Sequence, residues 1–141
     1  MKQFKYSKNS EERDSMLRFT DGVVGGTQHF NGLNVDVLKA LIAKKHADPI
    51  DSQNGAPTIA EFVEFMTQYP FATAHGYAVV PSRSDYRLSI EGIEGCVPKD
   101  VDIKKFVSDF SRFAEGADDV RYSHDQDTWC RYGRGFYCWW D

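Results

Sequence analysis

The sequence predicts an α+β fold, a two-layer sandwich in which about three helices pack on a mostly antiparallel β-sheet. The chain has 141 residues, the length of one compact domain, so we expect residues 1–141 to form a single α+β domain. Three segments carry apolar side chains at helical spacing, and one long segment alternates between apolar and polar residues as a strand does.

The first 33 residues have two competing readings. Ser10 is placed to cap a short helix that ends near Arg18, with acidic residues in its first turn. A strand over Met16–Thr20 is the alternative. The glycine-rich stretch 21–26 that follows is typical of a turn.

A helix is predicted over residues 34–46. Asn34 is a suitable N-cap, and Asp48-Pro49 stops the helix, since the residue before a proline avoids helical angles. The polar segment 48–57 is then expected to be a loop. The apolar stripe that predicts this helix consists of Val35, Leu38, Leu41 and Ile42.

A second helix is predicted to begin after Thr58. Thr58 and Glu61 have the spacing of a capping box, in which each side chain accepts a hydrogen bond from the other residue's backbone. Pro70 ends this helix. Its buried stripe is expected to comprise Ile59, Phe62, Val63 and Met66.

A β-hairpin is predicted next. Gly76–Val80 is apolar and β-branched or aromatic, and Pro81–Asp85 has the composition of a turn. Tyr86–Ile93 alternates, which gives the clearest strand pattern in the chain. Tyr86, Leu88 and Ile90 share one predicted face, and Arg87, Ser89 and Glu91 share the other.

A third helix is predicted from Asp100 or Asp102 to Glu115, with Gly116 placed after its end. Its apolar stripe is Ile103, Phe106, Val107, Phe110 and Phe113. Short antiparallel strands are expected after it, over residues 120–123, 128–132 and 136–140. The sequence leaves their register open: a three-residue turn pairs Cys130 with Cys138, and a two-residue turn pairs Cys130 with Trp139.

The C-terminal tail is aromatic on both faces of its predicted strands, and it holds all three tryptophans. Phe136, Cys138 and Trp140 alternate with Tyr137 and Trp139. The helical stripes supply cover for only one sheet face. The second face is therefore expected to be covered by the first 33 residues, by a second subunit, or by a ligand or protein partner.

The three cysteines, Cys96, Cys130 and Cys138, are odd in number and widely spaced. We expect no disulfide framework from them, which fits a reducing compartment and a cytoplasmic protein. The N-terminus shows no apolar leader segment, and no run is long enough to span a membrane. A leader removed beforehand would not be visible in the sequence.

Composition argues against several classes of function. The net charge is −4 with no basic stripe, so no nucleic-acid or membrane partner is expected. The glycines of the 21–26 stretch lack the pattern of a phosphate-binding loop. The four histidines and three cysteines lack metal-ligand spacing, and His124, Asp125 and Asp127 read as an ordinary turn, so neither a metal nor a cofactor is expected.

One polar cluster is predicted around the hairpin. Arg83 and Arg87 offer two guanidinium groups to a carboxylate or phosphate, and Asp85 is placed to hold one of them. His75 and Glu91 are expected on the same open sheet face. The cluster predicts either a solvated hairpin with ion pairs or the site of a small hydrolase or transferase acting on an anionic small molecule.

The leading prediction is a non-catalytic binding or interaction domain that uses an aromatic and arginine-bearing sheet surface, with a homodimer or a protein as possible partner. The small enzyme is placed second, as the alternative, because the sequence contains no complete catalytic motif. The candidate ligand- or partner-binding residues are His75, Arg83, Asp85, Arg87, Glu91, Trp129, Arg131, Tyr137 and Trp139.

Overall fold

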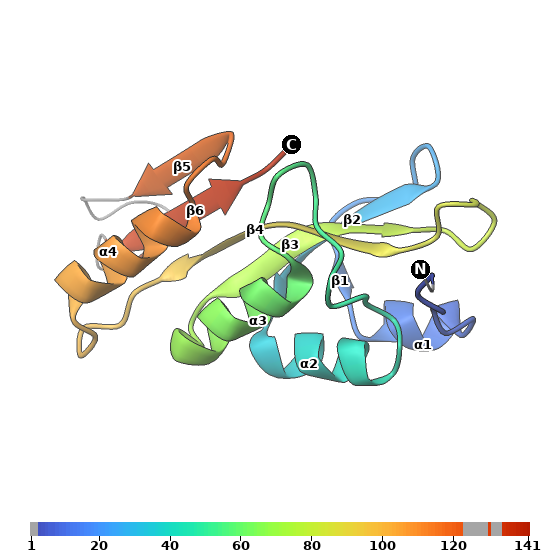
Figure 1. Cartoon of the computed structure of the whole chain (residues 1–141), viewed down its shortest axis with the longest axis horizontal. Helices are drawn as coiled ribbons and strands as arrows, with labels where there is room; N and C mark the ends of the chain where they lie inside the picture. Colours follow the sequence, from blue (N-terminus) through green and yellow to red (C-terminus); the bar gives the residue numbers. More distant parts are fainter. Residues whose placement is uncertain (1–2, 123–129, 131–133) are drawn as a thin grey trace.

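The computed structural model of the chain, which describes residues 3–122, 130 and 134–141, is an α+β fold with an antiparallel six-stranded open sheet (Figure 1). The predicted fold class is confirmed. The strand order is β1-β2-β3-β4-β6-β5, and the helices lie along one side of the sheet. The strands are β1 (Arg18–Phe19), β2 (Thr27–Leu33), β3 (Thr73–Val79), β4 (Leu88–Cys96), β5 (Asp119–Tyr122) and β6 (Gly135–Trp139). The helices are α1 (Ser10–Ser15), α2 (Val35–Ala43), α3 (Ile59–Gln68) and α4 (Ile103–Phe113).

The N-terminal segment contains both of the elements that the sequence offered as alternatives. Helix α1 is capped by Asn9, whose side chain accepts from the Glu12 backbone, so the prediction of Ser10 as the cap is off by one residue. Strand β1 lies within the predicted strand Met16–Thr20. Strand β2, which the sequence did not reveal, pairs with β1 and β3. These residues extend the sheet at one edge.

The three predicted helices are confirmed, together with their caps. The Asn34 side chain accepts from the Val37 backbone at 2.9 Å. The Thr58 capping box is complete in both directions. Asp102 accepts from the backbones of two following residues at the start of α4. Each cap satisfies N–H groups that have no partner within the helix, which is why the helices begin at these residues.

The core lies between the helices and one face of the sheet. Its fully buried residues include Leu38, Leu41, Phe62, Phe106, Phe110, Phe136 and Trp140. The predicted stripe of α4 is buried only in part, since Ile103 is 38% exposed and Val107 is 36% exposed. Their exposure corrects the prediction that the whole stripe is core.

The predicted hairpin is confirmed as β3 and β4, and it contains a β-bulge. Tyr77 pairs with Ser89 and Gly76 with Ile90, but His75 pairs with Gly92, so Glu91 is the extra residue. Gly92 is required at its position, because a Cβ there would lie 1.9 Å from the Cys138 carbonyl oxygen and 2.7 Å from His75 Nε2.

The tail strands are arranged differently from the prediction. Strand β6 lies between β4 and β5 and pairs with both, rather than with a strand over 128–132. That predicted strand lies outside the described residues apart from Cys130. The predicted division of faces is confirmed, because Phe136, Cys138 and Trp140 are buried while Tyr137 and Trp139 are partly exposed.

The cysteine prediction is wrong for one pair. Cys96 at the end of β4 and Cys130 form a disulfide with a Cα–Cα distance of 5.6 Å. Cys138 is free and buried, and burial raises the pKa of its thiol to about 12. An odd number of cysteines leaves one residue over but does not prevent the others from pairing. None of the helices within 3–122, 130 and 134–141 has the length and apolar character to cross a bilayer.

Candidate functional site

A cavity of about 320 Å³ lies on the sheet face opposite the core. We call it the open-face groove. Strands β2, β3, β4 and β6 contribute most of its lining, so a rigid hydrogen-bonded ladder holds the side chains in place. Its lining residues are Thr20, His29, Phe30, Asn31, His75, Gly76, Glu91, Glu94, Tyr137 and Trp139.

His29 is held at one end of the groove by Asp21. The Asp21 carboxylate accepts from the His29 backbone at 2.9 Å and lies 3.0 Å from the ring Nδ1. Hydrogen bonds from the His29 backbone, and then from its ring, lower the pKa of Asp21. The other ring nitrogen, Nε2, is 3.9 Å from Glu91 Oε1. The chain Asp21–His29–Glu91 therefore places a fixed imidazole between two carboxylates.

Glu91 lies on the bulge of β4 and is only 8% exposed. The Trp139 indole N–H donates to its Oε2 at 3.0 Å. This bond fixes the carboxylate and also orients the indole ring. In the strand pair, Trp139 lies directly across from Gly92, the residue that follows Glu91. The bulge and the glycine thus bring Glu91 and Trp139 together on the open face.

His75 and Tyr137 form a stacked pair at the centre of the groove, with ring centroids 5.2 Å apart and planes within 4°. Burial lowers the pKa of His75 to about 4, and a hydrogen bond with the Cys138 backbone acts in the opposite direction. His75 is therefore neutral at pH 7. Its Nε2 atom is buried and has no hydrogen-bond partner in the described structure.

Two further hydrogen-bonding groups of the groove lack partners among the described residues. Burial raises the pKa of Glu94, which lies directly across from Tyr137 in the strand pair. No hydrogen bond or ion pair from a described side chain reaches the Glu94 carboxylate. The side-chain oxygen Oδ1 of Asn31 is also buried without a donor. The Glu94 carboxylate is consequently an acceptor that a ligand in the groove can satisfy.

The predicted arginine cluster forms a separate structure at the hairpin turn. Arg83 donates to the Asp85 carboxylate at 2.8 Å from its Nε, and Arg87 donates to it at 2.8 Å from its Nη1. These two guanidinium groups lower the pKa of Asp85 to about 2. Both arginines are therefore ion-paired with the exposed carboxylate of Asp85 in the same turn, as the predicted solvated hairpin with ion pairs requires.

The five clustered residues of the sequence prediction are divided between two places. His75 and Glu91 line the open-face groove, whereas Asp85 and Arg87 line a different cavity of about 370 Å³ beside Tyr6 and the N-terminal segment. Arg83 lines neither cavity and joins the second place through its hydrogen bond to Asp85. Tyr77 connects the two places, because its hydroxyl accepts from Arg87 at 2.7 Å and its ring contacts that of His29.

Tyr137 and Trp139 of the aromatic prediction do lie in the groove, while Trp129 and Arg131 lie outside the described residues. Sequence reasoning missed Asp21, His29, Asn31 and Glu94. The first three lie in or beside β2. The alternation of apolar and polar residues over 27–31 is weak, because the polar Gln28 lies on the face of β2 that points toward the core. The available signal was the polar set Thr27, His29 and Asn31 at period two.

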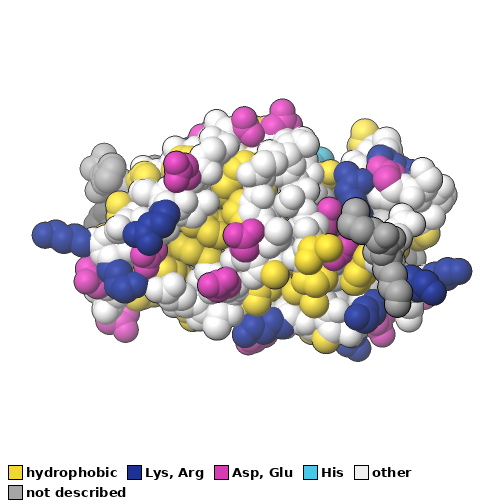
Figure 2. Space-filling model, viewed as in Figure 1, with side chains coloured by type: hydrophobic (Ala, Val, Ile, Leu, Met, Phe, Trp, Pro, Cys, Tyr) yellow, Lys and Arg dark blue, Asp and Glu magenta, His cyan; other side chains and the backbone are white. Residues whose placement is uncertain are grey.

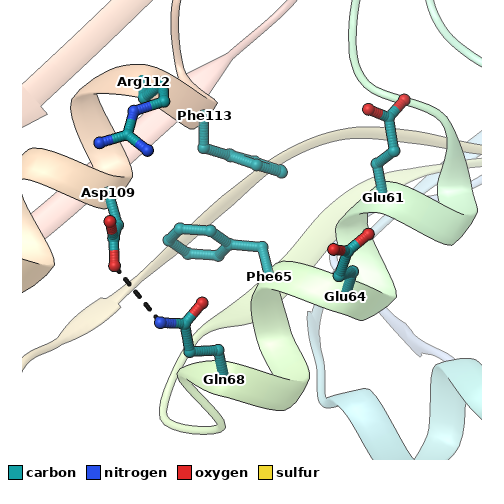
Figure 3. Close-up of a pocket in the computed structure, with 7 residues that line it drawn as sticks. All are labelled: Glu61, Glu64, Phe65, Gln68, Asp109, Arg112 and Phe113. Atoms are coloured by element: carbon teal, nitrogen blue, oxygen red, sulfur yellow. Dashed lines mark hydrogen bonds between the residues drawn. The ribbon is translucent and has the colours of Figure 1, made fainter.

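A third cavity, of about 270 Å³, lies between α3 and α4. Figure 3 shows Phe65 and Phe113 pointing toward one another between the two helices, and their rings stack at 4.4 Å. Carboxylates of α3 flank one side, and Asp109 and Arg112 flank the other (Figure 3). Hydrophobic side chains are visible between these helices in Figure 2. The predicted helical stripes did not reveal this opening, since they were expected to be fully covered.

No three His, Cys, Asp or Glu side chains in the described ranges converge as a metal site requires. Comparisons of the chain with protein-family models, with curated proteins and with solved structures found no match. The fold and the chemistry of the groove are therefore the basis for any functional assignment.

Proposed function

We propose that this protein is a non-catalytic binding domain and that the open-face groove is its binding surface. The observation that carries the proposal is that Trp139 and Tyr137 are partly exposed within a polar cavity, on the sheet face that no helix covers. Ligand sites combine apolar walls with a few fixed polar groups, and this groove has both.

The groove is preorganised, which supports binding. Trp139 is fixed by its hydrogen bond to Glu91, and Tyr137 is held between the His75 ring and the Arg121 guanidinium, 5.5 Å from its ring centroid. Side chains that are already ordered lose little conformational entropy when a ligand binds, so more of the contact energy appears as affinity.

The alternative is a small enzyme that uses the same groove. The Asp21–His29–Glu91 chain favours it, because a carboxylate that orients one imidazole nitrogen leaves the other free for general acid–base work. The two arginines proposed to hold an anionic substrate line no part of this groove, so such a substrate would need a different contact. Replacing His29 by Gln separates the two functions: an enzyme loses turnover, whereas a binding domain retains its ligand affinity.

The occupant of the groove is either a small ligand, a protein partner or a second copy of the chain. Light scattering on purified protein tests the homodimer directly. A dimer that dissociates when Trp139 is replaced by Ala supports the second copy, and a monomer at all concentrations supports a ligand or another protein.

The cytoplasmic location predicted from the sequence rested on free cysteines. The Cys96–Cys130 disulfide weakens that premise, because disulfides persist mainly in oxidising compartments. We therefore favour an oxidising environment. Counting the reactive thiols of the unreduced protein tests whether Cys96 and Cys130 are paired.

The binding proposal is tested by an NMR screen of ¹⁵N-labelled protein against a mixed set of small charged and neutral fragments. We expect shifts at the Trp139 indole signal and at the backbone of Gly92 and Tyr137, and we expect Trp139→Ala to abolish them. Val120→Ala is the matched control, since Val120 is an exposed apolar residue across from Cys138 on the other face. Shifts confined to α3 and α4 would contradict the proposal.

A further inference from the structure

The open-face groove has an excess of hydrogen-bond acceptors over donors. Glu91 and Glu94 bring two carboxylates into its lining, Asn31 adds a buried amide oxygen, and Asp21 stands beside it. No Lys or Arg occurs in the described lining. A group that donates several hydrogen bonds and carries positive charge would satisfy these atoms, whereas an anion would be repelled by them.

The arginine that lies over Tyr137 does not neutralise the carboxylates of the groove. Arg121 lies over the Tyr137 ring, but its guanidinium is paired with Asp119 at 2.8 Å and it is not part of the lining. His75 carries no charge at pH 7, because burial holds its pKa near 4. The carboxylates of Glu91 and Glu94 therefore dominate the local field.

Trp139 adds an aromatic surface of the type that binds cations. Its N–H is engaged by Glu91, and among the described residues no other ring or cation stacks on its indole. Tryptophan gives the strongest cation–π interaction among the aromatic side chains. A partly exposed indole that shares a groove with an unpaired carboxylate is the combination that recognises alkylammonium and guanidinium groups.

We propose that the open-face groove binds an organic cation, an alkylammonium or guanidinium group, with Glu94 as its counter-ion and Trp139 as the aromatic wall. This inference rests on the proposed binding function of the same groove. It replaces the anionic ligand expected from the sequence with one of opposite charge at this site.

The test is an NMR titration of the ¹⁵N-labelled protein at pH 7 and low salt with n-butylammonium, N-butylguanidinium, n-butanol and butyrate. These probes share an alkyl chain and differ in charge. We expect the two cations to shift the Trp139 indole signal in a saturable way, and butanol and butyrate to leave it unchanged. Raising the ionic strength to 0.5 M should weaken the cation affinity several-fold, because added salt screens the carboxylates.

Glu94→Gln keeps the shape of the side chain and removes its charge. We expect it to weaken cation affinity about tenfold, which corresponds to one charge-assisted contact of about 1.4 kcal/mol. Glu64→Gln is the matched control, since Glu64 lies on α3 in the cavity between the helices. Equal loss in the two variants would overturn the role of Glu94.

Failure of this inference and failure of the binding function give different results. If butanol or butyrate shifts the groove signals as strongly as the cations, the cation assignment is wrong and groove binding stands. If no probe of any charge shifts the groove signals, the cation inference is overturned, while the binding function is judged separately by the fragment screen and by light scattering. Where the cations do bind, Nα-acetyl-lysine N-methylamide, which keeps its side-chain ammonium, identifies the source of the cation. Tighter binding than butylammonium supports a lysine of a protein partner, and weaker binding supports a free amine.

Discussion

His75 is the clearest case in which the tertiary structure changes the chemistry of a single residue. In the sequence it reads as a candidate acid–base group. In the structure it stacks on Tyr137 over Gly92, and burial lowers its pKa from 6.5 to about 4. Because the neutral form is the stable one in the fold, its contribution is to packing and not to proton transfer at pH 7.

This pKa predicts how stability depends on pH. Between about pH 6.5 and 4 the unfolded chain binds a proton at His75 that the folded chain excludes, so the contribution of His75 is complete above pH 6.5 and is lost as the pH falls toward 4. We expect a loss of up to about 3 kcal/mol from this residue. Urea unfolding at pH 7, 5.5 and 4 measures it.

His75→Phe retains the stacked ring and removes the titrating group. We expect its free energy of unfolding to fall less than that of the wild type between pH 7 and 4. Parallel pH profiles for the two proteins would contradict the buried neutral histidine.

For Glu94 the dependence of stability on pH has the opposite sign to that for His75. Its pKa is raised by burial, so ionising it costs stability as the pH rises through its folded-state pKa. At pH 7 we expect Glu94→Gln to stabilise the protein, by under about 1 kcal/mol because solvent screens a half-buried group. Thermal unfolding at pH 7 checks the sign, with Glu64→Gln expected to change stability by less. Destabilisation by Glu94→Gln would indicate an unseen partner for this carboxylate.

At the scale of elements, the end of β6 and the residue that follows it separate the two roles of the aromatic tail. Trp140 is fully buried against Phe62 and Phe113, whereas its neighbour Trp139 faces the groove. Successive residues of a strand point to opposite faces, so the sequence alone predicted this division.

We expect Trp140→Ala to destabilise the protein by about 3–5 kcal/mol through the cavity it leaves in the core. Trp139→Ala should cost only about 1 kcal/mol, while abolishing ligand-induced shifts in the groove. Urea unfolding and the NMR titration together measure both effects. Similar costs for the two substitutions would show that Trp139 is a structural residue.

The position of β6 could not be predicted, because pairing between strands far apart in the sequence leaves no local pattern. The sequence predicted a strand over 136–140 with two aromatic faces, but β6 pairs with β4, about 40 residues earlier. The β-bulge of β4 also leaves no pattern in the sequence, although it places Glu91 beside Trp139. Helix caps such as Thr58 were predictable, because their partners lie within three residues.

At the scale of the whole molecule, the Cys96–Cys130 disulfide ties β4 to the tail across a sequence separation of 34 residues. A loop of that length reduces the entropy of the unfolded chain, so we expect reduction to cost up to about 4 kcal/mol. Urea unfolding with and without dithiothreitol measures this cost. Thiol titration of the unreduced protein in denaturant should find one reactive thiol, that of Cys138, and three thiols would contradict the disulfide.

The sequence by itself determined the fold class, the helices with their caps, the hairpin and the division of the aromatic tail into a buried and an exposed face. Each of these depends on residues a few positions apart, where the spacing of apolar and capping side chains expresses the geometry of the backbone. Only the tertiary structure decided which polar residues share a site. It joined His29 and Asn31 of β2 to Glu91, Glu94 and Trp139, and it kept Arg83 and Arg87 apart from them, because the order of strands in a sheet depends on contacts between distant parts of the chain.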